Sequence, residues 1–262
     1  IIYAIELFNR KECIFYLVNV LPITSYTGGE ATVYVAPEIL QESVLKENRE
    51  KLKKLLGEIE RLTDNPKHTF VSAALYGFFT DKIKQEVADK NIDLIIMGTK
   101  GASGIKAVSM GSNTGNVITK VSCAVLAIPA GARYSEPKAI GFPTDFQLGY
   151  TVNVLKQLKE VVMLHSSALK CLHVSTKKDE LTMLQLKNRD FLRDYFKNTE
   201  CSFGTLSEKK LDVAVQHFVE SQNLDMIVMV AKNLNFLERI LFRPRVEKIS
   251  YHTTVPFLVL HE

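Results

Sequence analysis

Residues 93–113 read DLIIMGTKGASGIKAVSMGSN and join an apolar run to a glycine-rich segment and a polar helix start. The run has the composition of a buried parallel strand, and Gly98 ends it. Gly101 follows Gly98 after two residues, and Gly111 and Ser112 come after nine more. Glycines let backbone N–H groups approach phosphate oxygens closely, and a helix N-terminus adds free donors. The stretch therefore predicts a phosphate-binding turn. On these residues alone, a loop whose glycines serve only turn geometry remains an open alternative.

Strands and helices alternate on both sides of this stretch. The apolar runs predict strands at residues 13–21, 68–75, 93–97 and 124–128, and the three- and four-residue spacings predict helices at 37–62, at 81–89 and from 112. Such alternation is typical of an α/β fold with a parallel sheet.

The same order of elements starts again after residue 137. At a constant offset of 132, Asp93 matches Asp225, Met97 matches Met229 and Leu126 matches Leu258. The second copy begins with a strand at 139–143 and a helix at about 148–164. The repeat predicts two copies of one domain, at residues 1–130 and 138–262, joined by a Pro-, Gly- and Ser-containing linker at 131–137.

The first copy lacks the strand that opens the second. It starts at Ile1 within an amphipathic helix that has no cap. In a doubly wound sheet the first strand lies centrally, and without it two neighbouring strands are left unbridged. We expect a further strand, turn and half-helix ahead of Ile1, about 20 residues from typical element lengths.

Composition excludes several classes of protein. The net charge of +4 is small and mixed along the chain, so nucleic acid is not an expected partner. No run approaches the ~18 apolar residues of a membrane span. The four cysteines contain no CxxC pair and favour a reducing, cytoplasmic compartment. The histidines have no metal-binding spacing and no catalytic constellation is found, so no metal site and no catalytic residue are predicted.

The glycine pattern resembles that of the universal stress protein family, whose nucleotide-binding members carry G, two residues, G, nine residues, then G and Ser or Thr. Residues 93–101 resemble the family's fourth strand, residues 123–129 its fifth, and residues 143–146 the turn after its first. The resemblance covers both copies. It implies two tandem five-stranded parallel sheets in the order 3-2-1-4-5, of the adenine nucleotide alpha hydrolase-like fold, with ATP above the strand ends.

The resemblance also implies a nucleotide site in the first copy. Backbone at Val20 would lie near the adenine, and ATP, with or without Mg²⁺, would take its phosphate contacts from Gly98, Lys100, Gly101, Gly111, Ser112 and Asn113. The acidic residue that contacts the ribose would precede Ile1.

The second copy departs from the pattern. Val230, Asn233, Arg243 and Pro244 stand where the first copy has Gly98, Gly101, Gly111 and Ser112. Asp145 matches the family's ribose-side acid, but an aspartate in a turn is as often a local cap. We expect no ATP site in this copy.

These observations predict a tandem universal stress protein, an ATP-binding regulatory module whose second copy is structural. The two copies are expected to pack as an intrachain pseudo-dimer, and a homodimer is a further expectation. A nucleotide-free scaffold with a vestigial glycine loop is the alternative, and a slow ATPase differs from the first reading only in the turnover of ATP.

Overall fold

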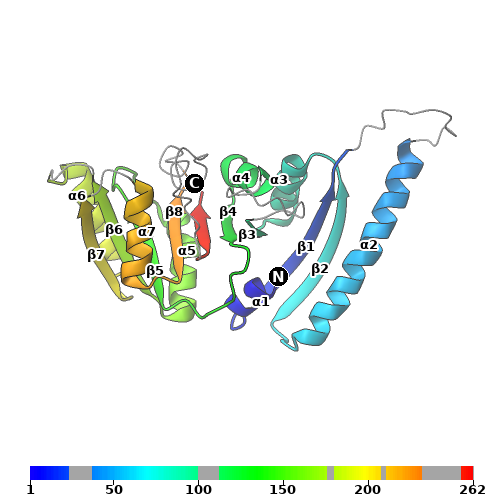
Figure 1. Cartoon of the computed structure of the whole chain (residues 1–262), viewed down its shortest axis with the longest axis horizontal. Helices are drawn as coiled ribbons and strands as arrows, with labels where there is room; N and C mark the ends of the chain where they lie inside the picture. The colour runs from blue at the N-terminus through cyan, green and yellow to red at the C-terminus, as the bar shows by residue number, and fades with distance from the viewer. Residues whose placement is uncertain (24–36, 100–111, 176–179, 208–210, 232–254, 262) are drawn as a thin grey trace. The chain divides into compact units, whose positions relative to one another are not determined.

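The structure is a computed structural model that describes residues 1–23, 37–99, 112–175, 180–207, 211–231 and 255–261 (Figure 1). The chain forms two compact units. The smaller unit spans residues 5–90, and the larger unit comprises residues 1–4 and 91–262. Helix α1 (Ile2–Leu7) contributes residues to both. The repeat boundaries at residues 130 and 138 therefore do not coincide with the division into compact units.

The smaller unit is built on two parallel strands, β1 (Cys13–Leu21) and β2 (His68–Tyr76). They are in register from Cys13 opposite His68 to Leu21 opposite Tyr76. Helix α2 (Pro37–Leu62) connects the two strands, and α3 (Phe79–Lys90) follows β2. The predicted strands and helices of this segment are confirmed, and the bounds of α2 are those predicted from its prolines and leucines.

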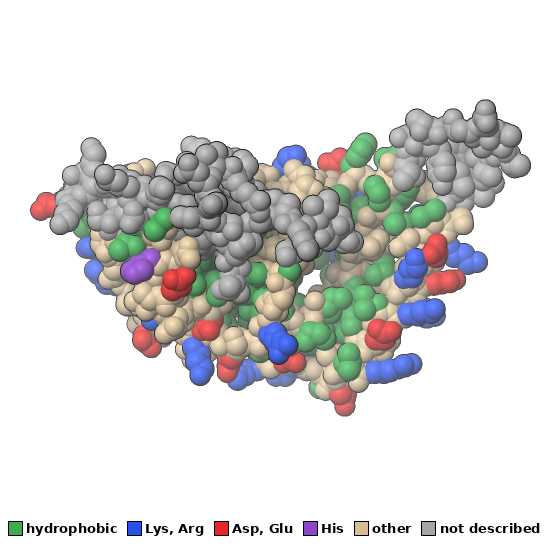
Figure 2. All heavy atoms as spheres, viewed as in Figure 1, with side chains coloured by type: hydrophobic (Ala, Val, Ile, Leu, Met, Phe, Trp, Pro, Cys, Tyr) green, Lys and Arg blue, Asp and Glu red, His purple; other side chains and the backbone are tan. Residues whose placement is uncertain are grey.

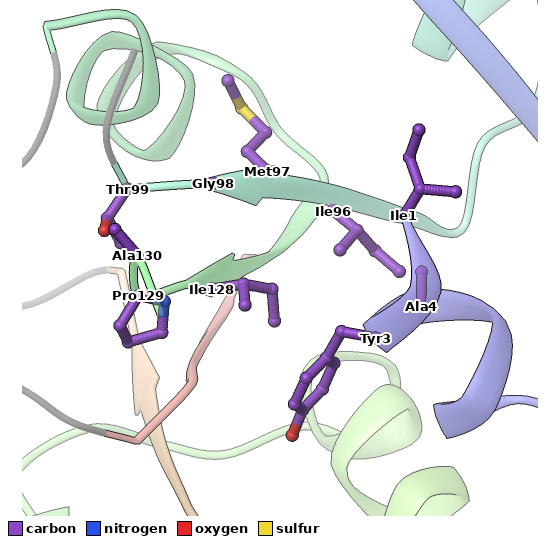
Figure 3. A pocket seen from close by; sticks show the side chains of 10 residues that line it. All are labelled: Ile1, Tyr3, Ala4, Ile96, Met97, Gly98, Thr99, Ile128, Pro129 and Ala130. Atoms are coloured by element: carbon purple, nitrogen blue, oxygen red, sulfur yellow. The ribbon is translucent and has the colours of Figure 1, made fainter. Parts of the chain in front are cut away.

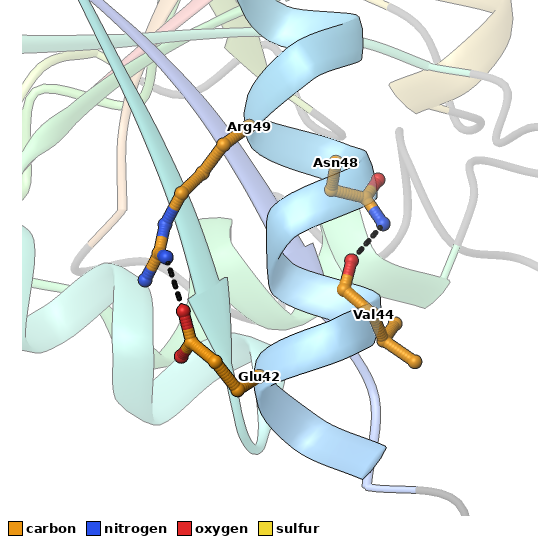
Figure 4. A network of polar contacts seen from close by, with 4 residues as sticks. All are labelled: Glu42, Val44, Asn48 and Arg49. Carbon is orange, nitrogen blue, oxygen red and sulfur yellow. Dashed lines mark hydrogen bonds and ion pairs between the residues drawn. The ribbon is translucent and has the colours of Figure 1, made fainter. Parts of the chain in front are cut away.

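Helix α2 contacts the sheet through a narrow apolar stripe. Leu45, Leu52 and Ile59 are buried at seven-residue spacing, and α2 packs mainly on β2. Its outer face is charged, with Arg49 Nη1 lying 2.7 Å from Glu42 Oε1 (Figure 4). Figure 2 shows Lys and Arg side chains interspersed with Asp and Glu along this helix. Mixed charge of this kind is typical of a solvated helix face.

The larger unit contains a seven-stranded sheet in the order β3-β4-β9-β8-β5-β6-β7 (Figure 1). Its strands are β3 (Leu94–Gly98), β4 (Ala124–Ile128), β5 (Ala139–Thr144), β6 (Ala168–Ser175), β7 (Cys201–Ser207), β8 (Met226–Val230) and β9 (Phe257–Leu260). Its helices are α4 (Ser112–Lys120), α5 (Val152–His165), α6 (Met183–Tyr195) and α7 (Leu211–Gln222). All strand pairs in it are parallel except β4 with β9.

The five strands of the second copy run β7-β6-β5-β8-β9, which is 3-2-1-4-5 when they are numbered within that copy. The first copy differs from the expected separate five-stranded sheet. Its β3 and β4 extend the sheet of the second copy, while β1 and β2 form a sheet of their own. No described strand pairs with both β1 and β3.

The antiparallel β4–β9 pair joins the two copies edge to edge. Val125 lies opposite Val259, Leu126 opposite Leu258, and Ala127 opposite Phe257. All of these residues are at most 1% exposed. We call this pair the seam. Because β9 also pairs with β8, the seam makes one continuous hydrogen-bonded sheet out of strands from both copies.

Helix α5 begins four residues later than predicted. The sequence predicts a start at Leu148, whereas Thr151 is the N-cap and its hydroxyl accepts a hydrogen bond from the Val154 N–H. Before it, Phe146 adopts a positive φ of 56°, and the Thr144 hydroxyl accepts from its N–H at 3.0 Å. A Thr at the N-cap satisfies an amide that the helix cannot. None of the described helices is long and apolar enough to cross a membrane.

Asp225 holds the start of β5, the central strand of the five in the second copy. Its Oδ2 accepts hydrogen bonds from the N–H groups of Lys138 and Ala139 at 2.8 and 2.9 Å. We expect Asp225→Ala to lower the free energy of unfolding by about 1.5–3 kcal/mol, because two amides lose a charged acceptor. Urea denaturation measures this loss. Asp225→Asn keeps an acceptor oxygen and should lose less, so equal losses in both variants would contradict this role.

Candidate functional site

The end of β3 and the start of α4 are tied together by one hydrogen bond. Thr114 Oγ1 donates to the carbonyl oxygen of Gly98 at 2.9 Å, and Thr114 is only 3% exposed. Thr99 N–H in turn donates to Ile128 O at 2.9 Å, which extends the β3–β4 pairing beyond Gly98. The helix start is therefore held at the carboxyl end of β3, and α/β folds bind ligands at the carboxyl ends of their parallel strands.

The first residues of α4 offer donors to an anion. Ser112 and Asn113 are exposed, and the first turn contains no acidic side chain. The first four N–H groups of a helix have no partner within the helix, and they carry a partial positive charge. An exposed hydroxyl, an exposed side-chain amide and the backbone amides of the first helical turn therefore lie near Gly98. This donor set fits phosphate oxygens.

A pocket of about 200 Å³ adjoins this strand end within the larger unit. Figure 3 shows Ile96 of β3 on the α1 side of the sheet, with Met97 pointing the opposite way. Ile96, Ile128 and Tyr3 contribute to its lining, with Gly98 and Thr99 at the strand end. Burial, followed by the neighbouring Tyr134 and Asp225, raises the pKa of Tyr3 to about 12. The side chains that line the pocket carry no charge and, apart from those of Tyr3 and Thr99, are apolar.

The structure brings together three of the predicted site residues, Gly98, Ser112 and Asn113. Lys100, Gly101 and Gly111 lie outside the described residues. Val20 is the eighth residue of β1, opposite Leu75 of β2, and belongs to the smaller unit.

Thr114 is the residue that sequence reasoning missed. The glycine pattern ends at Ser112 and gives no reason to look two residues further. The available signal was a Thr in the first turn of a predicted helix, because a Thr hydroxyl readily bonds to backbone groups.

In the second copy, side chains fill the corresponding strand end. The space beside Val230, the counterpart of Gly98, measures about 20 Å³, enough for about one water molecule. Tyr150 and Thr144 line it and are hydrogen-bonded to each other through their hydroxyls. Burial raises the pKa of Tyr150 far above its usual value.

Asp145 in this copy is engaged by one local contact and by one from α6. Its Oδ1 accepts from Gln147 N–H at 3.0 Å, and its carbonyl accepts from Gln185 Nε2 at 2.8 Å. The first of these is an Asx turn, the local role that the sequence leaves open for this residue.

We expect Thr114→Val to loosen α4 from β3. Valine has the same shape but cannot donate to Gly98, so the free energy of unfolding should fall by about 1–2 kcal/mol. Hydrogen exchange of the α4 amides should quicken more than that of α5. Thr114→Ser retains the hydroxyl and is the matched control; a valine variant with unchanged α4 exchange would show that the bond does not hold the helix.

Comparison with known proteins identifies a matching family model and relatives of part of the chain. Residues 2–129 match the family model described as the universal stress protein family. A universal stress protein of Thermus aquaticus is 30% identical over 107 residues, which cover 41% of this chain and 70% of that protein. One from Methanocaldococcus jannaschii is 25% identical over 126 residues, covering 48% and 71%.

Solved structures extend the likeness of fold over nearly the whole chain. A universal stress protein from Archaeoglobus fulgidus superposes with a TM-score of 0.67 at 18% identity, covering 94% of this chain and 86% of that one. A functionally unknown protein from Pseudomonas aeruginosa gives 0.53 at 12% identity, covering 96% and 94%. These two likenesses concern the fold alone.

Proposed function

Because the chain belongs to the universal stress protein family, we propose that it is a regulatory module of the stress response that binds ATP through its first copy. Family membership supports the stress-response role. The ATP site is the finer part of the proposal, and the second copy is structural in it.

The Thr114–Gly98 hydrogen bond carries the proposal of ATP binding. It holds the N-terminal amides of α4 at the carboxyl end of β3, beside exposed Ser112 and Asn113. Phosphate groups bind at helix starts of this kind because donors and partial positive charge coincide there. In the sequence, the spacing of Gly98, Gly101 and Gly111 supports the same ligand, and Lys100 would add a positive charge.

ATP would serve as a signal in this module. Fast chemistry requires a positioned acid, base or nucleophile beside the phosphates. The described residues at the start of α4 are Ser112, Asn113 and Thr114, and the hydroxyl of Thr114 is engaged by Gly98. We therefore propose that bound ATP sets the state of the protein, with turnover no faster than slow hydrolysis.

The test begins with protein purified without added nucleotide. After denaturation, mass spectrometry should detect released ATP, ADP or AMP, and calorimetry on nucleotide-stripped protein should show binding of Mg-ATP. A shift from ATP to ADP during incubation would assign slow hydrolysis to the same site.

If no nucleotide is released and none binds at millimolar Mg-ATP, the glycine segment is vestigial. The protein would then be a scaffold that acts through protein contacts alone. A Thr114→Val variant that binds Mg-ATP as the wild type does would remove the structural argument even if binding itself is found.

A further inference from the structure

Two of the four cysteines lie side by side on neighbouring strands of the second copy. On β6 and β7, Cys171 is opposite Phe203 and Cys201 is opposite Leu169. Because side chains alternate along a strand, Cys171 and Cys201 are diagonal neighbours on the same face of the sheet. The two thiols interact, and each shifts the pKa of the other.

The two thiols differ in their access to solvent. Cys171 is 2% exposed and lies between Phe142 of β5 and Phe203 of β7. Cys201 is the first residue of β7 and is only half-buried. Cys201 is therefore the more accessible of the two thiols to a reagent in solution.

A positive charge lies beside the more exposed thiol. The guanidinium of Arg193 on α6 lies 5.5 Å from the centre of the Phe203 ring, on the face of the sheet that carries both cysteines. Interaction with the Cys171 thiol, followed by the charge of Arg193, lowers the pKa of Cys201, although burial opposes the shift. The same interaction and burial raise the pKa of Cys171. Thiolate character is therefore concentrated on Cys201.

We propose that Cys201 is an oxidation site for hydroperoxides, and that Cys171 converts the product into an intrachain disulfide between β6 and β7. Reactive cysteines of this kind are partly exposed, sit in a positive environment and have a second thiol within reach. The proposal is independent of nucleotide binding, because every residue in it belongs to the second copy.

The chemistry balances with hydrogen peroxide as the oxidant. The Cys201 thiolate attacks one peroxide oxygen, the S–O bond forms, the O–O bond breaks, and the leaving hydroxide takes a proton to become water. Cys171 sulfur then attacks the sulfenic sulfur of Cys201. The S–S bond forms and the S–O bond breaks, and the hydroxide leaves as water with the Cys171 proton. Two thiols and one peroxide give one disulfide and two waters.

Closing the disulfide requires a small movement of β7. Diagonal neighbours in a sheet have Cα atoms about 7–8 Å apart, and a disulfide spans at most about 7 Å. Cys201 stands at the beginning of its strand, where the one ladder bond before it is Leu169 N–H to Glu200 O at 2.7 Å. The start of an edge strand can shift by this amount without displacing the rest of the sheet.

Cys123 is an internal reference for an unreactive thiol. It is 6% exposed, its Sγ lies 3.3 Å from Ile92 O, and burial raises its pKa to about 11. Treated with the same oxidant, Cys123 should remain a free thiol.

The test exposes the full chain to hydrogen peroxide, alkylates the remaining thiols and maps the products by peptide mass spectrometry. We expect a linked peptide joining Cys171 to Cys201, with the loss of two hydrogens. In Cys171→Ala, Cys201 should instead gain one oxygen as a sulfenic acid that dimedone traps. In Cys201→Ala, Cys171 should stay reduced.

One arginine variant and one lysine variant distinguish the effect of the Arg193 charge on Cys201 from the effect of removing any positive charge from α6. Arg193→Gln should slow the oxidation of Cys201 about threefold to tenfold, since thiolate fraction follows pKa at a factor of ten per unit. Lys187→Gln, an exposed cation on the same helix, should leave the rate unchanged. The proposal is overturned if Cys201 oxidises no faster than Cys123, or if the disulfides formed are between chains.

Discussion

Replacing Gly111 by valine is expected to weaken ATP binding about 100-fold, or ~2.7 kcal/mol at ~1.4 kcal/mol per factor of ten. In the proposed site Gly111 directly precedes Ser112, the first residue of α4. A branched side chain at that position would occupy the space through which phosphate oxygens approach the backbone donors. Calorimetric titration with Mg-ATP measures the loss, and co-purifying nucleotide should disappear from the variant.

The matched control is Gly149→Val. Gly149 is exposed, and a Cβ built there meets no atom within 4 Å. This variant adds the same side chain in the second copy and should bind Mg-ATP as the wild type does. If the Gly111 variant keeps wild-type affinity while the protein binds ATP, the phosphates lie elsewhere and the proposed site is wrong.

Replacing Phe257 by alanine is expected to lower the free energy of unfolding by about 3–5 kcal/mol. Phe257 is 1% exposed and begins β9, where it lies opposite Ala127 of β4 on one side and Ile227 of β8 on the other. Its loss leaves a cavity in the seam. Because β9 is hydrogen-bonded to β4 on one side and to β8 on the other, the strands cannot move in to fill that cavity. Unfolding in urea, followed by circular dichroism, measures the effect.

Met183→Ala provides the comparison for a large apolar side chain that is not buried. Met183 is 83% exposed at the start of α6, so its removal should change stability by less than about 0.5 kcal/mol. A Phe257 variant as stable as the Met183 variant would mean that the seam contributes little to the fold.

Local structure could be predicted from the sequence because its signals are local. The apolar run at residues 13–21 predicts β1 with the correct bounds. The leucine spacing of residues 37–62, which begins at Pro37, does the same for α2. The predicted start of α5, at about Leu148, was wrong because Thr151 is a better N-cap than the residues before it. Propensity alone does not rank such competing caps.

Pairing between distant strands could not be predicted in the same way. Nothing in the apolar pattern of residues 124–128 distinguishes a strand that ends a five-stranded sheet from one that continues into another copy. The seam depends on which strand edges are left unpaired once each copy has formed its own sheet. That outcome is a property of the whole chain. The candidate site shows a similar limit, since the glycine spacing predicts Gly98 and Ser112 but not the Thr114 hydroxyl that holds them together.

The seam also has a consequence for the order in which the chain folds. It joins residue 125 to residue 259, so the loop that it closes contains nearly the whole second copy. Contacts so distant in sequence form slowly, after the local β–α–β pairings. Until then the β4 and β9 edges are unpaired, and an unpaired edge accepts a strand from any chain that offers one. During refolding at high concentration, β9 of one chain therefore competes for β4 of another, and the resulting dimer exchanges strands through the same residue pairs that close the monomer.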